Sequence, residues 1–240
     1  QEKMATRQAY GKALVEIGAV NKNLVVMDAD LSKSTMTAEF AKVYPERFFN
    51  MGIAEQNLYA AACGLALSGK VVCASTFAMF AAGRAYEQIR NAVGYPHLNV
   101  KIGATHAGIS VGEDGATHQC NEDIALMRTI PGMTIINPSD DVEARAAVKA
   151  AYEMEGPVYL RFGRLAVPVI NDRDDYKFEI GKGVVLKEGT DLTLIATGLE
   201  VAESLAAAEK LEADGISVEV INMHTIKPLD VDLVVRSAAK

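Results

Sequence analysis

Short apolar runs alternate with longer stretches of helical periodicity through the first 170 residues of this 240-residue chain. The first helix is expected at Met4–Val20, because Tyr10, Ala13, Leu14 and Ile17 make an i, i+3, i+4, i+7 stripe. Strands are expected at Leu24–Met27, Phe48–Met51, Val71–Ala74, Asn99–Ile102, Thr134–Ile136 and Val158–Leu160, and further helices at Ala54–Leu67, Ala81–Val93, Glu122–Ile130 and Asp141–Met154. Continuously apolar strands separated by helices indicate a parallel sheet covered on both faces. The pattern predicts a doubly wound α/β domain over residues 1–170, with its site at the carboxyl ends of the strands.

A second, smaller α/β unit is expected over residues 171–240. Pro168 and the polar run Asn171–Asp175 mark a linker. Beyond it the pattern predicts strands near Gly183–Leu186, Leu192–Ala196 and Ser217–Ile221, a helix at Val201–Ala213 and the start of another at Val231–Lys240. About 70 residues of this kind are too few to bury both faces of a parallel sheet. We therefore expect an incomplete domain, either truncated or completed by a partner.

Composition narrows the function classes. Half of the residues are hydrophobic and 23% are charged, as in a soluble globular core. No apolar run approaches the roughly 20 residues that span a membrane, and the start does not resemble a signal peptide. The net charge of −7, without a Lys/Arg block, argues against nucleic acid as a partner. Cys63, Cys73 and Cys120 are odd in number and form no CxxC pair, which indicates free thiols in a reducing cytoplasm.

The stretch Gly103–Gln119, reading GATHAGISVGEDGATHQ, carries two of the four histidines, a Glu-Asp pair and several glycines. It follows the strand expected at Asn99–Ile102. Polar residues on a glycine-rich loop at the end of a strand are typical of binding sites. The sequence alone equally allows an exposed loop in which His106 and His118 make ordinary hydrogen bonds.

Other polar and aromatic residues near strand ends have both a functional and a structural interpretation. Asp and Ser after the first strand are good helix caps. A carboxylate in the first turn of a helix is favourable by itself. Aromatic residues three apart usually belong to a core, and arginines often close a strand or face solvent. The residues concerned are Asp28, Asp30, Ser32, Ser34, Glu55, Phe77, Phe80, Arg7, Arg161 and Arg164.

Familiar catalytic motifs are not found. The sequence has no GxSxG, HExxH, P-loop or GxGxxG pattern. His106 and His118 could bind a metal, but no third ligand is suitably spaced. Cys120 follows His118 by two residues, yet a Cys–His nucleophile would need an orienting group that the sequence does not identify.

Four segments, in order along the first domain, resemble the pyrimidine-binding domain of transketolases, which belong to the thiamine-diphosphate enzyme superfamily. They read MGIAEQN, STFAMF, THAGISVGEDGATHQ and RTIPGMTIINPSD. Further on, MHTIKPLD resembles the C-terminal domain that transketolases share with 2-oxoacid dehydrogenase β subunits. Ordinary transketolases begin with a diphosphate-binding domain that carries a GDG…N metal motif, and GEDG is not that motif. The sequence is most similar to the C-terminal subunit of a split, two-chain transketolase.

The resemblance implies roles for the cofactor-binding residues. Glu55 matches the glutamate that hydrogen-bonds N1′ of the thiamine aminopyrimidine and takes part in catalysis. Phe77 and Phe80 match the aromatic pair that packs against the pyrimidine, and Asp30 matches an acid close to the cofactor. Gly83 departs from the pattern, because many transketolases have a third aromatic residue there.

The resemblance also implies a substrate site. Asp114 matches the residue that reads a donor hydroxyl, and His118 matches a catalytic histidine near the reacting carbonyl. The groups that hold the terminal phosphate of the sugar match Arg7, Ser34, His106 and Arg161. The THAG segment at His106 departs from a more usual sequence that contains Asp.

The implied protein is a transferase of ketol groups in the pentose phosphate pathway, acting on sugar phosphates in the cytoplasm. The diphosphate and Mg²⁺ would be held by an N-terminal partner subunit, so that this chain supplies no metal ligand and is inactive alone. A homodimer within a heterotetramer is expected. Deoxyxylulose-phosphate synthases tend to have arginine where Phe80 stands, and dehydrogenase β subunits lack GEDGATHQ in this form. They and a non-catalytic scaffold domain are the alternatives.

Overall fold

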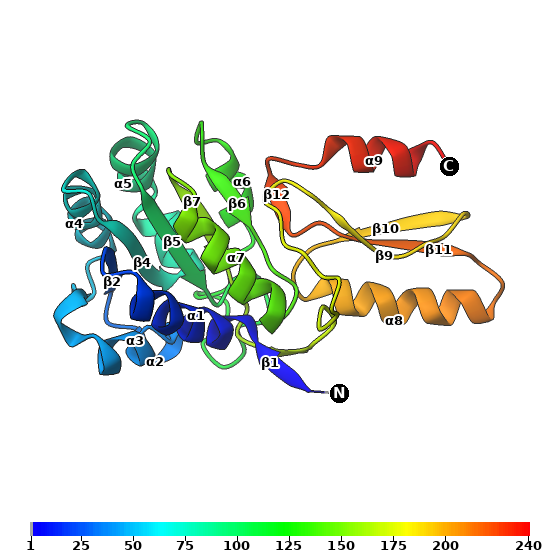
Figure 1. Ribbon diagram of the computed structural model, residues 1–240, viewed down its shortest axis with the longest axis horizontal. Coiled ribbons are helices and arrows are strands. Elements are labelled where there is room, and N and C mark those ends of the chain that lie inside the picture. Colours follow the sequence, from blue (N-terminus) through cyan, green and yellow to red (C-terminus); the bar gives the residue numbers. More distant parts are fainter. Residues whose placement is uncertain (1) are drawn as a thin grey trace.

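A seven-stranded sheet organises the larger lobe of the molecule, in the computed structural model that describes residues 2–240 (Figure 1). Its order is β12-β6-β7-β5-β4-β2-β3. The strands are β2 (Leu24–Asp28), β3 (Phe48–Asn50), β4 (Val71–Phe77), β5 (Val100–Thr105), β6 (Thr134–Ile136), β7 (Val158–Arg161) and β12 (Thr225–Lys227). All neighbours pair in parallel except β12, which pairs antiparallel with β6. The predicted parallel sheet is thus confirmed, with one antiparallel edge strand from the distant end of the chain.

Helices cover both faces of this sheet, as a doubly wound fold requires. One face is packed by α1 (Thr6–Val20), α3 (Ala38–Val43) and α7 (Asp141–Glu153), and the other by α4 (Glu55–Leu67), α5 (Tyr86–Gln88) and α6 (Asp123–Arg128). The short α2 (Ser32–Thr35) and a 3₁₀ turn (Pro45–Arg47) complete the first crossovers. The expected stripe of Tyr10, Ala13, Leu14 and Ile17 is buried.

One predicted helix has an irregular form. The stretch expected as a helix at Ala81–Val93 consists of α5 between two π-helical segments, Phe80–Arg84 and Ile89–Gly94. In the first of these the amide of Ala85 donates to the carbonyl of Phe80, five residues back. A π-helical turn is wider than an α-turn and is frequent at functional sites. The turn at Phe80–Arg84 therefore determines where the side chains of these two residues point.

Two short strands were not expected from the sequence. The segments β1 (Lys3–Ala5) and β8 (Ala166–Pro168) pair antiparallel and tie the start of the chain to the segment after β7. Three residues are too few to show the alternation that identifies a strand.

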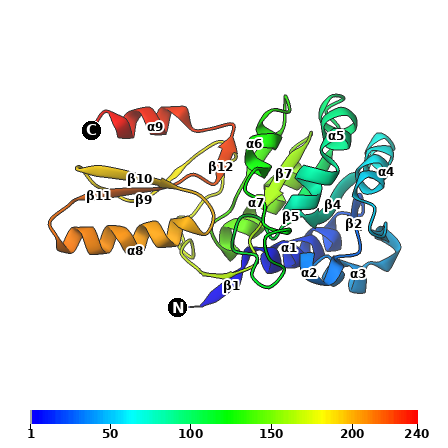
Figure 2. The same cartoon turned by 180° about the vertical axis from the view of Figure 1, so that it is seen from behind.

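The smaller lobe contains β9 (Val184–Lys187), β10 (Leu192–Ala196) and β11 (Val218–Asn222) in the order β10-β11-β9. Figure 2 shows α8 (Glu200–Ala213) and α9 (Val231–Ala238) on opposite sides of this sheet. The helix expected from Val231 is present as α9, which packs Leu233 against Ile221 and Met223. That the domain is incomplete stays a prediction. The strand β10 remains partly open, with Ile195 46% exposed.

A buried polar network joins the two lobes. The Glu143 carboxylate accepts hydrogen bonds from the Tyr176 hydroxyl (2.6 Å) and the Asn222 amide (2.7 Å), and from the backbone and hydroxyl of Ser139 (both 2.7 Å). Asn171, in the expected linker, is fully buried in the same network, where its backbone N–H donates to Asp140. The segment after β8 is therefore held against the larger lobe, and the boundary near residue 170 stays a prediction.

We expect Glu143→Ala to destabilise the chain by about 3–5 kcal/mol, because it leaves several buried donors without an acceptor. The measurement is urea unfolding of the purified chain. Glu153→Ala, at an exposed position of the same helix, is the matched control and should change stability by less than about 0.5 kcal/mol. Equal effects of the two substitutions would show that the network contributes little.

Candidate active site at the carboxyl ends of the central strands

Four of the predicted site residues follow neighbouring strands at one edge of the large sheet. Asp30 comes after β2, Glu55 begins α4 after β3, Phe77 ends β4, and His106 follows β5. The strands β3, β2, β4 and β5 are adjacent and parallel. Their carboxyl ends therefore meet, and the loops that follow them line a common site.

An aromatic cluster of Phe77, Phe80, His106 and His118 forms the centre of this edge. The rings of Phe77 and His106 stack with centroids 3.9 Å apart, and those of Phe77 and Phe80 lie 5.9 Å apart at 15°. The edge of His118 meets the Phe80 ring, 5.2 Å between centroids. The glycine-rich loop thus belongs to the same site as the Phe pair. His106 itself has a φ of +57°, a strained backbone for a residue other than glycine.

Burial keeps the His106 imidazole neutral. Desolvation, and next the positive charge of Arg7, lower the pKa of His106 to about 4. Its Nδ1 lies 3.0 Å from the Thr105 hydroxyl, which fixes the ring orientation. A neutral, oriented imidazole can donate or accept a hydrogen bond without adding charge.

Glu55 is a buried carboxylate beside the aromatic cluster. Its side chain is 1% exposed, and both of its oxygens accept hydrogen bonds from Nη1 of Arg84, each at 2.9 Å. The same Arg84 places its Cζ 4.7 Å from the centroid of the Phe80 ring. Arg84 was not among the residues singled out in the sequence, where nothing connects it to Glu55, 29 positions earlier.

Asp28 has a structural role in the loop that follows β2. The buried carboxylate accepts hydrogen bonds from the amide of Leu31 (2.6 Å) and the hydroxyls of Thr35 (2.6 Å) and Thr37 (2.9 Å). Burial raises the pKa of Asp28 to about 6. These bonds shape the loop after β2. Asp30, exposed and with a φ of +65°, is held there by hydrogen bonds to Asn50.

Two arginines, one in the first turn of α1 and one between β7 and β8, act on the same site. Arg7 donates through Nη1 to the Ser34 carbonyl (2.7 Å), while its Nε is buried and has no partner within residues 2–240. Burial and the charge of Arg164 lower the pKa of Arg7. Arg164 also acts on His106, and it pairs with Glu113 at 3.2 Å. Arg7 is thus bound to Ser34, and the charges of Arg7 and Arg164 both act on His106.

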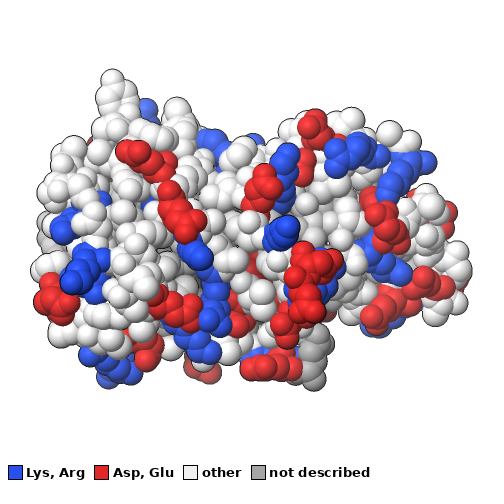
Figure 3. Space-filling model, viewed as in Figure 1, with Lys and Arg blue, Asp and Glu red and all other residues white. Residues whose placement is uncertain are grey.

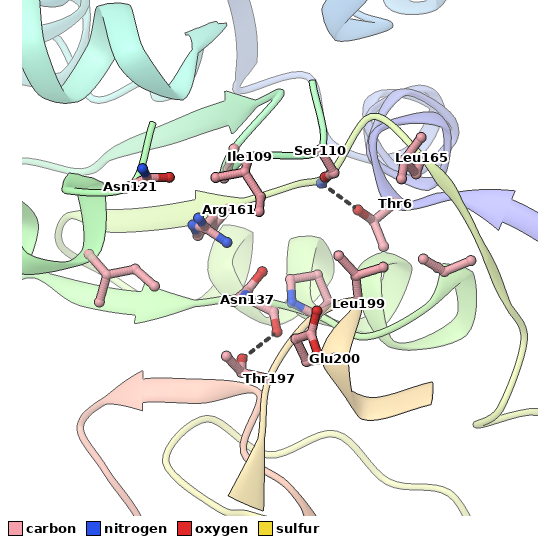
Figure 4. A pocket seen from close by; sticks show the side chains of 16 residues that line it. Thr6, Ile109, Ser110, Asn121, Asn137, Arg161, Leu165, Thr197, Leu199 and Glu200 are labelled. Atoms are coloured by element: carbon pink, nitrogen blue, oxygen red, sulfur yellow. Dashed lines mark hydrogen bonds between the residues drawn. The ribbon is translucent and has the colours of Figure 1, made fainter. Parts of the chain in front are cut away.

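Arg161 is bound to a buried acid, and its role in holding the phosphate stays a prediction. Its Nε donates to the fully buried Asp123 carboxylate at 2.8 Å, which Tyr159 also contacts. Figure 4 shows Arg161 facing a cavity of about 330 Å³ between the two lobes, near Asn137 and Thr197. The charge of Arg164, three residues further on, also acts on Arg7 and His106.

Asp114 and His118 are presented by the loop between Gly108 and Cys120. The backbones of these two residues exchange hydrogen bonds of 2.9 and 3.2 Å, which close the loop at its base. Asp114 is exposed, and its charge acts on His106. Closing the loop at its base limits the conformations open to these side chains, and it holds His118 against Phe77 and Phe80.

A cysteine nucleophile, one of the alternatives from the sequence, has little basis in the structure. Cys120 is buried, and desolvation raises its pKa to about 11, so the thiol is a poor nucleophile beside His118. Cys63 and Cys73 are also free and buried. Across residues 2–240, no three His, Cys, Asp or Glu side chains are grouped to hold a metal. Nor does this part of the chain contain a helix of the length and apolarity that crossing a membrane requires. On the face drawn in Figure 3, acidic and basic side chains are interspersed.

Comparison with known proteins shows which family the chain resembles. The model of the transketolase pyrimidine-binding domain matches residues 2–169, and that of the transketolase C-terminal domain matches residues 181–240. A protein of Methanocaldococcus jannaschii described as a transketolase C-terminal section is 55% identical over 96% of this chain and 73% of its own length. A 6-deoxy-6-sulfo-D-fructose transketolase subunit of a Clostridium species is 40% identical over 98% of this chain and 72% of its own.

Solved structures give the same result. A split-gene transketolase, described as an inactive β4 tetramer, superposes with a TM-score of 0.91 at 57% identity, over 99% of this chain and 77% of that one. Transketolase of Pichia stipitis in complex with sedoheptulose 7-phosphate has a TM-score of 0.86 at 27% identity, over 96% of this chain and 36% of that one. Since both family models match, and relatives of 55% and 40% identity are described as a transketolase C-terminal section and a transketolase subunit, this chain belongs to the transketolase family.

Proposed function

We propose that this chain is the subunit of a two-chain transketolase that carries the pyrimidine half of a thiamine-diphosphate site. With its partner it transfers a two-carbon ketol unit between sugar phosphates. The observation that carries the proposal is the aromatic cluster with the buried Glu55 carboxylate beside it. The same edge presents two histidines and an arginine pair to a substrate.

The residues present fit the aminopyrimidine of thiamine diphosphate. The flat faces of Phe77 and Phe80 suit an aromatic ring, and a carboxylate buried next to them suits a ring nitrogen that carries or shares a proton. When bound, the cofactor supplies the nucleophilic carbon that attacks the ketose carbonyl. Glu55 would hold N1′, and Asp30 would lie close to the same ring.

The arginine pair indicates an anionic end on the sugar. Arg7 and Arg164 are close enough that one lowers the pKa of the other, and an anion between them would relieve this repulsion. Ser34 and the neutral His106 would complete this anion site. Asp114 would accept from a hydroxyl of the donor, and His118 would hydrogen-bond at the reacting carbonyl.

The rest of the catalytic site would come from a partner. An N-terminal subunit would bind Mg²⁺ and the diphosphate, and this chain would form a homodimer within a heterotetramer in the cytoplasm. We infer that the chain is inactive alone, as the β4 tetramer of the split-gene relative is described. A role in the pentose phosphate pathway follows if the substrates are pentose phosphates.

Reconstitution tests this function. The chain is mixed with its N-terminal partner, thiamine diphosphate, Mg²⁺, xylulose 5-phosphate and ribose 5-phosphate. We expect glyceraldehyde 3-phosphate to form only when both subunits are present. Pyruvate in place of the ketose tests deoxyxylulose-phosphate synthesis, for which no product is expected. A well-folded complex that forms neither product would contradict an enzymatic role and favour a scaffold domain.

A further inference from the structure

Arg84 contacts two groups, Glu55 and Phe80, that the proposed function assigns to the cofactor ring. Its guanidinium lies over the Phe80 ring, with Cζ 4.7 Å from the centroid. One nitrogen of the same group donates to both oxygens of Glu55. A guanidinium is planar, cationic and rich in N–H donors, so it stacks on aromatic faces and binds carboxylates. An aminopyrimidine would use the same ring face and the same carboxylate.

The local helix geometry explains why Arg84 reaches this position. Phe80 and Arg84 are the first and last residues of a π-helical segment and lie four positions apart, which places their side chains on the same face. Gly83 has no side chain next to Arg84, where the resemblance would place a third aromatic residue. A Cβ at position 83 would lie 2.6 Å from the end of the Met79 side chain.

Arg84 is half-exposed to solvent, whereas its partner Glu55 is buried. The Arg84 side chain is 49% exposed, whereas Glu55 is 1% exposed. Arg84 can therefore turn into solvent and be rehydrated, but Glu55 stays in the protein. A buried carboxylate without a partner is costly, so the departure of Arg84 is favourable only when another donor replaces it.

We propose that Arg84 is an internal substitute for the aminopyrimidine, a positioning residue that holds Glu55 while the cofactor is absent and leaves when the cofactor binds. The proposal rests on the function proposed above. In the free subunit, Arg84 then fills the site of the cofactor ring. The apparent affinity for the cofactor then equals the intrinsic affinity multiplied by the fraction of molecules in which Arg84 is turned out.

The test is calorimetric titration of the assembled two-subunit complex with thiamine diphosphate and Mg²⁺. In the Arg84→Met variant, which keeps length but removes the donor and the charge, we expect Kd to fall by about tenfold. The same substitution should lower the melting temperature of the cofactor-free complex, because Glu55 is left without a cation. Tighter binding together with lower stability is a combination that a merely structural residue would not produce.

Two further variants serve as controls. Arg90→Met removes an exposed arginine just past the same segment and should change neither quantity. Arg84→Lys keeps the charge without the planar fork, and Kd should lie between the wild type and Arg84→Met; it carries the test if Arg84→Met does not fold. An unchanged or weaker affinity in the Arg84 variants would overturn the proposal while leaving the function intact. Failure of the wild-type complex to bind thiamine diphosphate would instead overturn the proposed function.

Discussion

Glu55→Gln in the reconstituted complex is expected to lower kcat by about 100-fold or more, which corresponds to about 2.7 kcal/mol in the barrier. The amide keeps the size of the side chain, but it cannot take or share a proton with a ring nitrogen as the carboxyl does. The decisive measurement is kcat for ketol transfer at saturating thiamine diphosphate.

The control for this substitution is Glu39→Gln, at a surface position of α3 where Glu39 pairs with Lys42. It should leave kcat unchanged, since an exposed ion pair contributes little. Circular dichroism of both variants should match the wild type. A reduction below about tenfold in the Glu55 variant would be incompatible with the role proposed for this carboxyl.

The parallel sheet was predictable because its strands are continuously apolar and separated by helices of clear periodicity. Val100–Thr105 and Val71–Phe77, for example, are buried over nearly their full length. The strand β12 was not predictable in this way. It has three residues and joins the large sheet from between β11 and α9 of the smaller lobe, so its place depends on tertiary packing.

The candidate site was partly predictable. The motifs identified Glu55, Phe77, Phe80, His106 and His118, and the fold brings them together because they follow adjacent parallel strands or lie on the loop after β5. Local spacing could not show that Arg84 turns onto Glu55, since that contact depends on a π-helical turn. Arg161 ends β7 and Arg164 follows it by three residues, so local spacing alone does not assign the phosphate to one of them, and Arg161 stays a prediction.

Arg164→Leu is expected to raise KM for a phosphorylated donor by roughly 10- to 100-fold, the loss of one hydrogen bond to a charged group. Arg161→Leu should raise it by less than about threefold, because that guanidinium faces the cavity between the lobes and is bound to Asp123. It should instead lower stability, since it leaves the buried Asp123 without its cation.

Initial rates with xylulose 5-phosphate and with unphosphorylated xylulose separate these effects. Removal of an anion-binding arginine should affect only the phosphorylated donor, so the preference for xylulose 5-phosphate should collapse in Arg164→Leu and persist in Arg161→Leu. The two substitutions delete the same group three residues apart, so each controls for the other. If the preference collapses in Arg161→Leu instead, the phosphate is bound on the Asp123 side of β7, and Arg164 acts only on the loop that carries Glu113.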